Sequence, residues 1–302
     1  MRNAFTEFCC EQAKIDKHLH VLTADLGYGI FDSFRQEFQD RFINVGVAEQ
    51  NLIGIGTGMA LTGLRPICYS IGNFPTLRCL EQIRNDAAYH DAQVTIVSSG
   101  GGFGYGQLGM SHHATEDVGV MSSLPNVSIY SPATPFEAKM MLNHVYDADG
   151  VKYVRLEKTG EDYELTNSNP LKDGYFQYSG GSDGLILCLG TTLSEGVHAM
   201  RILRNLGINV AVCSLAFVKS HNKHYENLLS LISAHRRVTT IEEHNKFGGI
   251  GSMVSNLVTD NCLNIKLTKI AMNDTYSSVV GDQKYLRNYY GINANAIIDT
   301  FK

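Results

Sequence analysis

Short apolar runs alternate with amphipathic segments along the whole chain, and this alternation limits its possible folds more than any other feature. The runs are rich in β-branched residues and predict strands, whereas the segments between them have helical periodicity. Strands that alternate with helices favour an α/β fold with a largely parallel sheet, because parallel neighbours need crossover connections. In the first half, the predicted strands are HVLTAD (20–25), RFINVG (41–46), RPICYS (65–70), AQVTIVSS (92–99), NVSIYSP (126–132) and VKYVRLE (151–157), and the predicted helices are 4–16, 31–40, 48–61, 76–90, 115–124 and 135–147.

A polar stretch rich in turn residues then interrupts the pattern and predicts a linker over 161–182. A second series follows, so the sequence predicts two open, largely parallel-sheet α/β domains, over 1–160 and 183–302. The second set of predicted strands is GLILCLG (184–190), NVAVCSL (209–215), RRVTTIEE (236–243) and LNIKLTKIA (263–271), with helices over 194–206, 224–234, 249–260 and 282–290.

The composition excludes several classes of function. The 302 residues carry a net charge of −5 without a block of Lys or Arg, so neither a nucleic-acid nor a membrane-surface partner is expected. No signal pattern opens the sequence, and no apolar run reaches the roughly 18 residues of a membrane span. The seven cysteines lack CxxC or Cys/His ligand spacing, which predicts reduced thiols, no metal site in this chain and a cytoplasmic location.

The glycine-rich stretch GGGFGYGQLGMSHHATED follows a predicted strand, and GYGQLG (104–109) matches the G-x-G-x-x-G pattern. We reject a dinucleotide site because MSHHA separates the pattern from the next helix, and no acidic residue ends a second strand at the required spacing. The stretch is typical of a mobile loop whose backbone approaches a ligand. Two interpretations of His112 and His113 remain open. Either one side chain is exposed and the other caps a helix, or one imidazole is directed into a site.

Two carboxylates follow strands of the first predicted domain. Asp25 ends HVLTAD, at the edge where ligands of open parallel sheets gather, although a turn or N-cap role explains it equally well. Glu49, in NVGVAEQN, begins a helix whose dipole alone would favour its charge. The dipole does not explain Gly54, Gly56 and Gly58, because each glycine costs a helix about 1 kcal/mol. We therefore expect close packing against another backbone, and a desolvated Glu49 that prefers to share a proton.

An ordered set of motifs resembles the transketolase superfamily of thiamine-diphosphate enzymes. The set comprises NVGVAEQN with IGIGTGMALTGLRP, then CLEQIRND, GMSHHATEDVGVMSSLPNVSIYSPATPFEA and TIEEHNKFGGIGS. The resemblance covers a pyrimidine-binding domain over about 1–160 and continues through a C-terminal domain. Each motif is weak by itself, and their order along nearly the whole chain makes the resemblance specific.

The resemblance implies roles at the cofactor. Glu49 matches the glutamate that hydrogen-bonds the N1′ nitrogen of the aminopyrimidine and promotes the 4′-imino tautomer, whose nitrogen removes the thiazolium C2 proton. The cofactor then supplies the carbanion chemistry. Asp25 matches an aspartate near the cofactor, and Phe74 is expected to provide the aromatic face for the pyrimidine.

The resemblance also implies contacts with a sugar or sugar-phosphate substrate. His112, in SHHATED, matches a histidine that contacts substrate oxygens. Arg2 and Arg155 match two arginines that hold the phosphate of the acceptor, a task that suits the bidentate guanidinium. Leu108 stands where the family has an aspartate, Gly100 near a second family histidine, and Gly29 at a phosphate-binding serine. We infer an acceptor that differs from ribose 5-phosphate or is held differently.

The diphosphate end of the cofactor requires, in this family, a GDG motif followed by paired asparagines that bind Mg²⁺. GGSDG (180–184) comes close but leads directly into a predicted strand and lacks the asparagines. The chain is therefore expected to be one half of a split enzyme. It is expected to form a heterotetramer with an N-terminal-half subunit that carries the diphosphate and Mg²⁺ site.

Several functions remain open at this point. A split transketolase-like enzyme would transfer a two-carbon ketol unit between sugars. A 1-deoxyxylulose-5-phosphate-synthase-like enzyme or a 2-oxo-acid dehydrogenase beta subunit would decarboxylate an oxo acid. A non-catalytic subunit would keep only the fold. A dinucleotide oxidoreductase would rest on GYGQLG alone, the site rejected above.

Overall fold

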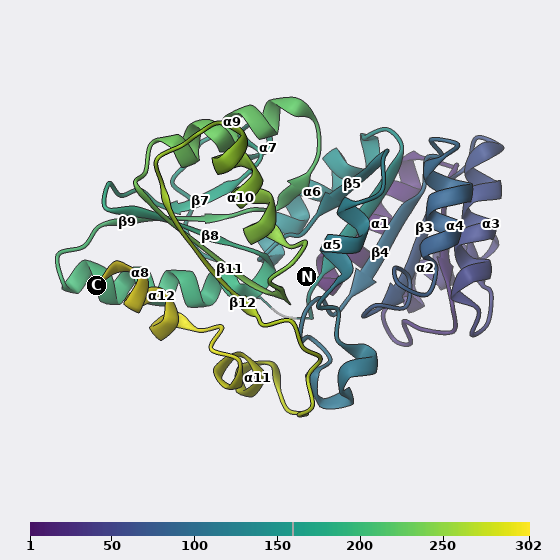
Figure 1. Ribbon diagram of the computed structural model, residues 1–302. Helices are drawn as coiled ribbons and strands as arrows, with labels where there is room; N and C mark the ends of the chain where they lie inside the picture. Colours follow the sequence, from purple (N-terminus) through teal and green to yellow (C-terminus); the bar gives the residue numbers. More distant parts are fainter. Residues whose placement is uncertain (159) are drawn as a thin grey trace.

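The computed structural model describes residues 1–158 and 160–302, and it contains two α/β domains side by side (Figure 1). The first is built on a seven-stranded sheet with the order β10-β5-β6-β4-β3-β1-β2, parallel except for β10. Its strands are β1 (Leu19–Thr23), β2 (Phe42–Asn44), β3 (Arg65–Ile71), β4 (Thr95–Ser99), β5 (Val127–Tyr130), β6 (Val151–Leu156) and β10 (Phe217–Lys219).

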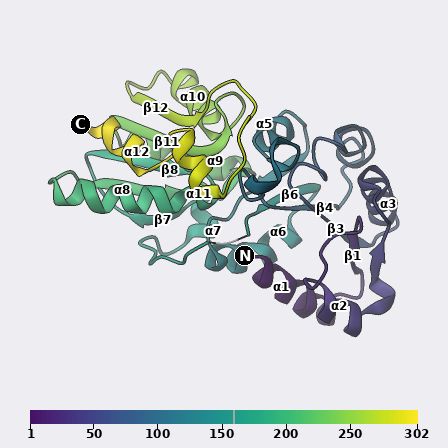
Figure 2. The same cartoon turned by 90° about the horizontal axis from the view of Figure 1, so that it is seen from below.

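Helices cover both faces of this sheet, which explains why every residue of β4 and β6 is buried. One face carries α1 (Arg2–Ile15), α2 (Asp32–Glu37) and α6 (Pro135–Asp147), as Figure 2 shows from below. The other carries α3 (Glu49–Leu61), α4 (Leu80–Gln82) with the π-helical turn η2 (Ile83–Ala88), and α5 (Asp117–Ser122). Short 3-10 turns η1 (Gln39–Arg41), η3 (Gly106–Leu108) and η4 (Met110–His112) complete the domain.

The second domain has a five-stranded sheet with the order β12-β11-β8-β9-β7. Its strands are β7 (Phe176–Ser179), β8 (Gly184–Cys188), β9 (Val210–Ser214), β11 (Arg237–Asn245) and β12 (Lys266–Met272). Helices α8 (Leu193–Asn205) and α12 (Ala294–Phe301) pack together, and α10 (Ile250–Asp260) packs on β11 and β12. The remaining elements are η5 (Gly190–Thr192), α7 (Pro170–Asp173), α9 (Asn222–Ser233) and α11 (Gln283–Tyr289).

The predicted α/β class and largely parallel sheets are confirmed, with two differences at the domain junction. The range expected to be a linker, 161–182, contains α7 and β7, and β7 forms the antiparallel edge of the second sheet. β10, which follows β9 in sequence, instead pairs antiparallel with β5 of the first sheet. The predicted boundary at residue 160 lies beside Thr159, which is outside the described residues.

A buried carboxylate also connects the two domains. Glu137 lies in the first turn of α6, where its N–H donates to the Oγ1 of Thr134 at 3.0 Å. Its carboxylate accepts hydrogen bonds from the hydroxyls of Tyr178 (2.5 Å) and Ser214 (3.0 Å), which belong to the second domain. Burial raises the pKa of Glu137 to about 7. Buried hydrogen bonds of Glu137 therefore connect the two domains at the junction.

Within the part of the chain that the structure describes, no helix is both long enough and apolar enough to span a bilayer.

Candidate functional site

Glu49 is the first residue of α3, and its side chain is only 4% exposed although it carries a charge. Its Oε2 atom pairs with Nη1 of Arg78 at 2.9 Å. The two side chains face a cavity of about 530 Å³, whose walls also include Val47, Ala48, Gln50, Asn51, Gly54 and Gln82. The carboxylate is thus largely shielded from solvent by its own chain, whereas the sequence predicted desolvation by another backbone, and it still faces a cavity.

Asp25 supports the turn that leads into Glu49. It follows β1 with a φ of 55°, in the left-handed region. The Asp25 N–H donates to Oδ1 of Asn44 at 2.9 Å, and Nδ2 of Asn44 donates back to Oδ1 of Asp25 at 3.1 Å. The same Asn44 Oδ1 accepts from the N–H of Gly46 at 3.0 Å. Hydrogen bonds from the Tyr28 hydroxyl and then from Asn44 lower the pKa of Asp25.

Phe74 and His112 come from separate loops and lie against each other. Their ring centroids are 5.1 Å apart with an edge-on geometry. The guanidinium of Arg78 lies over the ring of Phe74, 4.7 Å from its centroid. Glu49, Arg78, Phe74 and His112 therefore form a continuous series of contacts. Burial, followed by the charge of His113, lowers the pKa of His112.

His113 has a different environment from its neighbour. It is buried, its ring packs edge-on against Phe103 at 5.4 Å, and its Nε2 lies 3.3 Å from the carbonyl oxygen of Gly106. The sequence left two alternatives for these histidines. The first, with one exposed and one helix-capping side chain, does not describe this pair. His112 is the half-buried member, and it lies beside Phe74.

The glycine run 100–102 packs against protein side chains and not against an open ligand site. A Cβ at Gly100 would overlap the ring of Tyr105, and one at Gly101 would lie 2.6 Å from the guanidinium carbon of Arg155. A Cβ at Gly102 would meet the carboxylate of Glu243. The position near which the family has a second histidine thus has no room for one. GYGQLG (104–109) contains the short turn η3 and ends just before η4, without the helix that a dinucleotide site requires.

Arg155 occupies the domain junction, where its side chain is fully buried. Its Nε donates to Oδ2 of Asp117 at 3.0 Å and its Nη1 to Oε1 of Glu157 at 3.3 Å, while its Nη2 donates to the carbonyls of Ala114 and Glu243 at 3.3 Å each. Burial alone would lower the pKa of Arg155, but the carboxylates of Asp117 and Glu157 raise it by more. Because these bonds engage both terminal nitrogens, Arg155 has no free face for a phosphate here. This differs from its expected role.

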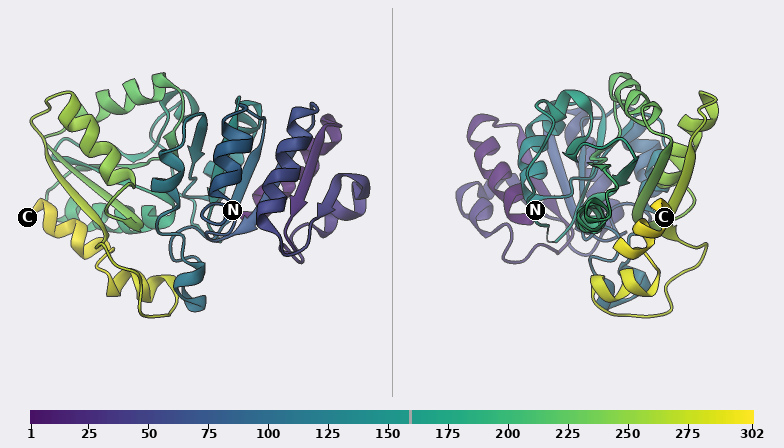
Figure 3. Two further views of the ribbon diagram at one scale, coloured as in Figure 1. Left: turned by 45° about the vertical axis from the view of Figure 1, so that its right-hand side comes forward. Right: turned by 90° about the vertical axis from the view of Figure 1, so that its left-hand side faces the viewer.

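The network continues into the second domain. The side-chain amide of Gln283 donates to Glu157 at 3.0 Å and to Glu243 at 2.9 Å. Arg287 forms an ion pair with Glu243 and donates to the Thr191 hydroxyl at 2.7 Å. Burial, followed by the charge of Glu243, raises the pKa of Glu157. These residues hold α11 and the loop over 100–113 together at one end of the junction (Figure 3).

Lys158 is a cation near the expected phosphate position that sequence reasoning missed. It lies just beyond the carboxyl end of β6, and its Nζ is 3.8 Å from the ring centroid of Tyr105. It lines a cavity of about 300 Å³ together with Leu108, which is 55% exposed. Burial and the positive charge of Arg2, at the start of α1, lower the pKa of Lys158. The rule that ligands gather at carboxyl ends of strands would have favoured Lys158 over Arg155, which lies within the strand.

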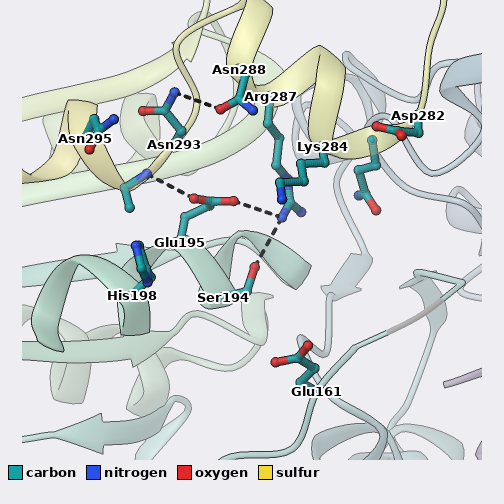
Figure 4. Close-up of a pocket in the computed structure, with 12 residues that line it drawn as sticks. Glu161, Ser194, Glu195, His198, Asp282, Lys284, Arg287, Asn288, Asn293 and Asn295 are labelled. Carbon is teal, nitrogen blue, oxygen red and sulfur yellow. Dashed lines mark hydrogen bonds and ion pairs between the residues drawn. The ribbon is translucent and has the colours of Figure 1, made fainter.

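A larger cavity, of about 710 Å³, lies between α8, α11 and α12 (Figure 4). Arg287, Ser194 and Glu195 point toward one another across it, with Nη1 of Arg287 3.2 Å from the Ser194 hydroxyl and 3.7 Å from Glu195. These charged groups are already paired, and none of the residues expected from the sequence lines the cavity. We therefore place the candidate site at Glu49. Among the described residues, no group of three or more His, Cys, Asp or Glu side chains could hold a metal ion.

The glycines of α3 divide between two environments. A Cβ at Gly56 would lie 2.5 Å from Sγ of Cys68 in β3, so this glycine packs against the chain's own sheet. A Cβ at Gly54 or Gly58 would meet no other part of this chain within 4 Å. These two glycines lie one helical turn apart on a face that this chain leaves uncovered, and Gly54 also lines the cavity at Glu49.

Comparison with known proteins agrees with this arrangement. The family described as "Transketolase, pyrimidine binding domain" matches residues 1–160, and "Transketolase, C-terminal domain" matches residues 176–297. An apulose-4-phosphate transketolase subunit of Actinobacillus succinogenes is 32% identical over 272 residues, covering 88% of this chain and 85% of that protein. 1-Deoxy-D-xylulose-5-phosphate synthase of Halothermothrix orenii is 30% identical over 94% of this chain, which spans 45% of that protein.

A solved structure described as "Split gene transketolase, inactive beta4 tetramer" superposes with a TM-score of 0.87 at 28% identity, covering 99% of this chain and 96% of that one. The two matched domains lie in the order that the sequence motifs predicted, and the relatives of comparable length include subunits of split transketolases. The chain therefore belongs to the transketolase family, as a split subunit that comprises the pyrimidine-binding and C-terminal domains.

Proposed function

We propose that this chain is the pyrimidine-binding subunit of a two-chain enzyme that uses thiamine diphosphate to transfer a two-carbon ketol unit between sugars or sugar phosphates. The observation that carries the proposal is the buried carboxylate of Glu49 facing a cavity, in continuous contact through Arg78 and Phe74 with His112. Four residues from three segments of the chain meet there.

The residues around Glu49 fit an aminopyrimidine ring. Glu49 offers a carboxylate to a ring nitrogen, and Phe74 offers an aromatic face. Gln82 lines the same cavity, and among the described residues its buried Oε1 has no hydrogen-bond partner, so it could accept from an amino group. When bound, the cofactor would supply the carbanion chemistry and the electron sink. Asp25, through Asn44 and Gly46, would hold the turn that positions Glu49.

The chain's own contribution to the reaction is proton handling and substrate orientation. Glu49, buried at the edge of the cavity, would be a hydrogen-bond partner for the ring nitrogen. His112, half-buried beside Phe74, would donate a hydrogen bond to a substrate oxygen. Arg2 and Lys158 would neutralise a phosphate on the acceptor, and the exposed Leu108 beside Lys158 favours an acceptor without a hydroxyl at that point. Arg155 is left out of this proposal because its guanidinium is already engaged.

We also propose that a second subunit carries the diphosphate and Mg²⁺ site and that the two kinds of chain form a heterotetramer. The uncovered face of Gly54 and Gly58 beside the cavity supports packing against another chain. The description of the structural neighbour as an inactive β4 tetramer supports self-association without activity. A cytoplasmic location is supported by the seven cysteines, all of which are free thiols.

A decarboxylating synthase is the second candidate, because one relative of 30% identity is a 1-deoxy-D-xylulose-5-phosphate synthase. Release of CO₂ from pyruvate by the assembled enzyme, without ketol transfer from any ketose donor, would favour this alternative.

The deciding experiment replaces Glu49 with Gln in the enzyme assembled with its partner subunit, thiamine diphosphate and Mg²⁺. We expect the rate of ketol transfer to fall by about 10²–10⁴-fold, the usual contribution of a positioned acid–base group. Glu81→Gln is the matched control, since Glu81 is exposed on α4. Unchanged activity of the Glu49 variant would remove this residue from the catalytic machinery and favour a non-catalytic subunit.

A further inference from the structure

Arg78 makes two contacts that together define a small binding site within the chain. Its Nη1 donates to Oε2 of Glu49 at 2.9 Å, and its guanidinium carbon lies 4.7 Å from the centroid of Phe74. A planar group thus lies over an aromatic ring and is hydrogen-bonded to a buried carboxylate. Among the described residues, Glu49 is the one side chain that Arg78 pairs with, and 48% of the Arg78 side chain is exposed.

These are the same two contacts that the proposed function assigns to the aminopyrimidine ring. A guanidinium and an aminopyrimidine are both planar, and both present nitrogen atoms along one edge. The guanidinium already takes Oε2 of Glu49 and the space over the ring of Phe74, so an aminopyrimidine held by the same two side chains would compete with it for that space. On this interpretation Arg78 must move when the cofactor binds, and its 48% exposed side chain, whose one ion pair among the described residues is with Glu49, allows it to do so.

We propose that Arg78 is an internal stand-in for the cofactor's aminopyrimidine, which occupies its site in the free subunit and is displaced when the cofactor binds. The inference rests on the proposed function of Glu49. It explains how the free subunit tolerates a carboxylate that is 4% exposed, because a buried charge without a partner is strongly unfavourable. It also means that cofactor binding competes with a contact inside the protein, which lowers the apparent affinity.

The first test uses this chain alone and measures the urea midpoint of unfolding for Arg78→Ala, Glu49→Gln and the double variant. We expect the shifts in midpoint of the two single variants not to add up in the double variant. Once Glu49 is replaced by neutral Gln, removal of Arg78 no longer breaks an ion pair. Arg84→Ala is the matched control, since Arg84 is exposed in the following turn and bonds Asn85. Additive shifts would show that the two side chains do not interact and would overturn the inference.

The second test measures the affinity of the assembled enzyme for thiamine diphosphate, with Mg²⁺ present, by titration calorimetry. Removal of the competitor in Arg78→Ala should tighten binding by about three- to tenfold, the range expected for one ion pair with a cation–π contact. Arg78→Lys should lie between this variant and the wild type, because Lys keeps the charge without the planar group. Equal or weaker binding by Arg78→Ala would contradict the stand-in role.

The two failures can be told apart. If the wild-type assembly binds no thiamine diphosphate, the proposed function is wrong and the inference falls with it. If the wild type binds the cofactor and transfers ketol units, but Arg78→Ala binds no more tightly, the proposed function stands and only the stand-in role is lost.

Discussion

At the scale of single residues, Arg155 and Lys158 lie close together in sequence but differ in burial. Arg155 is enclosed by Asp117, Glu157 and two carbonyls, so its charge is used to hold the junction. Lys158 has passed the end of β6 and borders a cavity beside Leu108. A residue that contacts substrate must keep a free face, and of these two only Lys158 has one.

This difference predicts opposite phenotypes for two matched substitutions. Lys158→Ala should raise KM for a phosphorylated acceptor by about tenfold or more, with little change in stability, because it removes a charge that borders the cavity and rests on the ring of Tyr105 without a buried ion pair. Arg155→Ala should lower the free energy of unfolding by about 3–5 kcal/mol, because it leaves buried carboxylates unpaired. Steady-state kinetics and urea unfolding distinguish the two. A normal KM for the Lys158 variant would show that residues other than Lys158 bind the phosphate of the acceptor.

At the scale of elements, α3 uses its glycines for two purposes. Gly56 allows the helix to approach Cys68 of β3, whereas Gly58 faces open space in this chain. Glycine lowers helix stability at both positions, so each must be explained by a neighbour, and the neighbour of Gly58 is absent from the single chain. The helix is thus adapted to its own sheet on one side and, we propose, to another subunit on the other.

A pair of alanine substitutions separates these purposes. Gly58→Ala should stabilise the isolated chain by about 0.5–1 kcal/mol through helix propensity, while Gly56→Ala should destabilise it by about 1–3 kcal/mol through overpacking against Cys68. Thermal unfolding of the isolated chain checks both. If Gly58 packs closely against another subunit, its substitution should also weaken assembly, measured by analytical ultracentrifugation. Normal assembly of a larger Gly58→Leu variant would exclude that face as an interface.

The elements that sequence could and could not predict differ in the range of their interactions. The buried strands and amphipathic helices carried their own periodic signal, and all ten predicted strands are present. β10 was missed because only its pairing with β5, distant in sequence, makes it a strand. Helix α12 was also missed, although Asn293 caps it by accepting from the N–H of Ala296 at 3.1 Å, and this cap was readable.

Contacts between residues distant in sequence also limited how much of the candidate site could be predicted. The motif around Glu49 pointed to a buried carboxylate, but nothing in the sequence indicated that Arg78 would be its partner. That pairing depends on how the loop containing Phe74 folds back onto the start of α3. Arg155 was assigned because it matched a family arginine, whereas its burial depends on contacts with both domains.

At the scale of the whole molecule, a buried polar network joins the domains. Arg287, on α11, pairs with Glu243 of β11, and Gln283 extends the contact to Glu157 at the end of the first domain. Two carboxylates, Glu157 and Glu243, therefore share one donor amide and depend on Arg287 and Arg155 for charge compensation. The relative position of the domains rests on this balance of charges and on the hydrogen bonds of Glu137.

Arg287→Met tests that balance, because Met keeps much of the volume and removes the charge. We expect the free energy of unfolding to fall by about 3–5 kcal/mol at pH 8, since Glu157 and Glu243 are left undercompensated. Lys284→Met on the same helix is the control and should change stability by less than about 0.5 kcal/mol, since Lys284 is exposed.

The loss in free energy of unfolding caused by Arg287→Met should also depend on pH. The direction of this dependence follows from the pKa of Glu157. Its folded pKa is raised above the ordinary 4.5, first by burial and then by Glu243, while Arg287 lowers it. A carboxyl that holds its proton more tightly when folded makes the protein less stable as pH rises from 4.5 through the folded pKa. Without Arg287 that pKa rises further, so the destabilisation should be smaller at pH 5 than at pH 8. Urea unfolding at both pH values measures it, and a loss independent of pH would mean that packing, and not charge, is what Arg287 contributes to the junction.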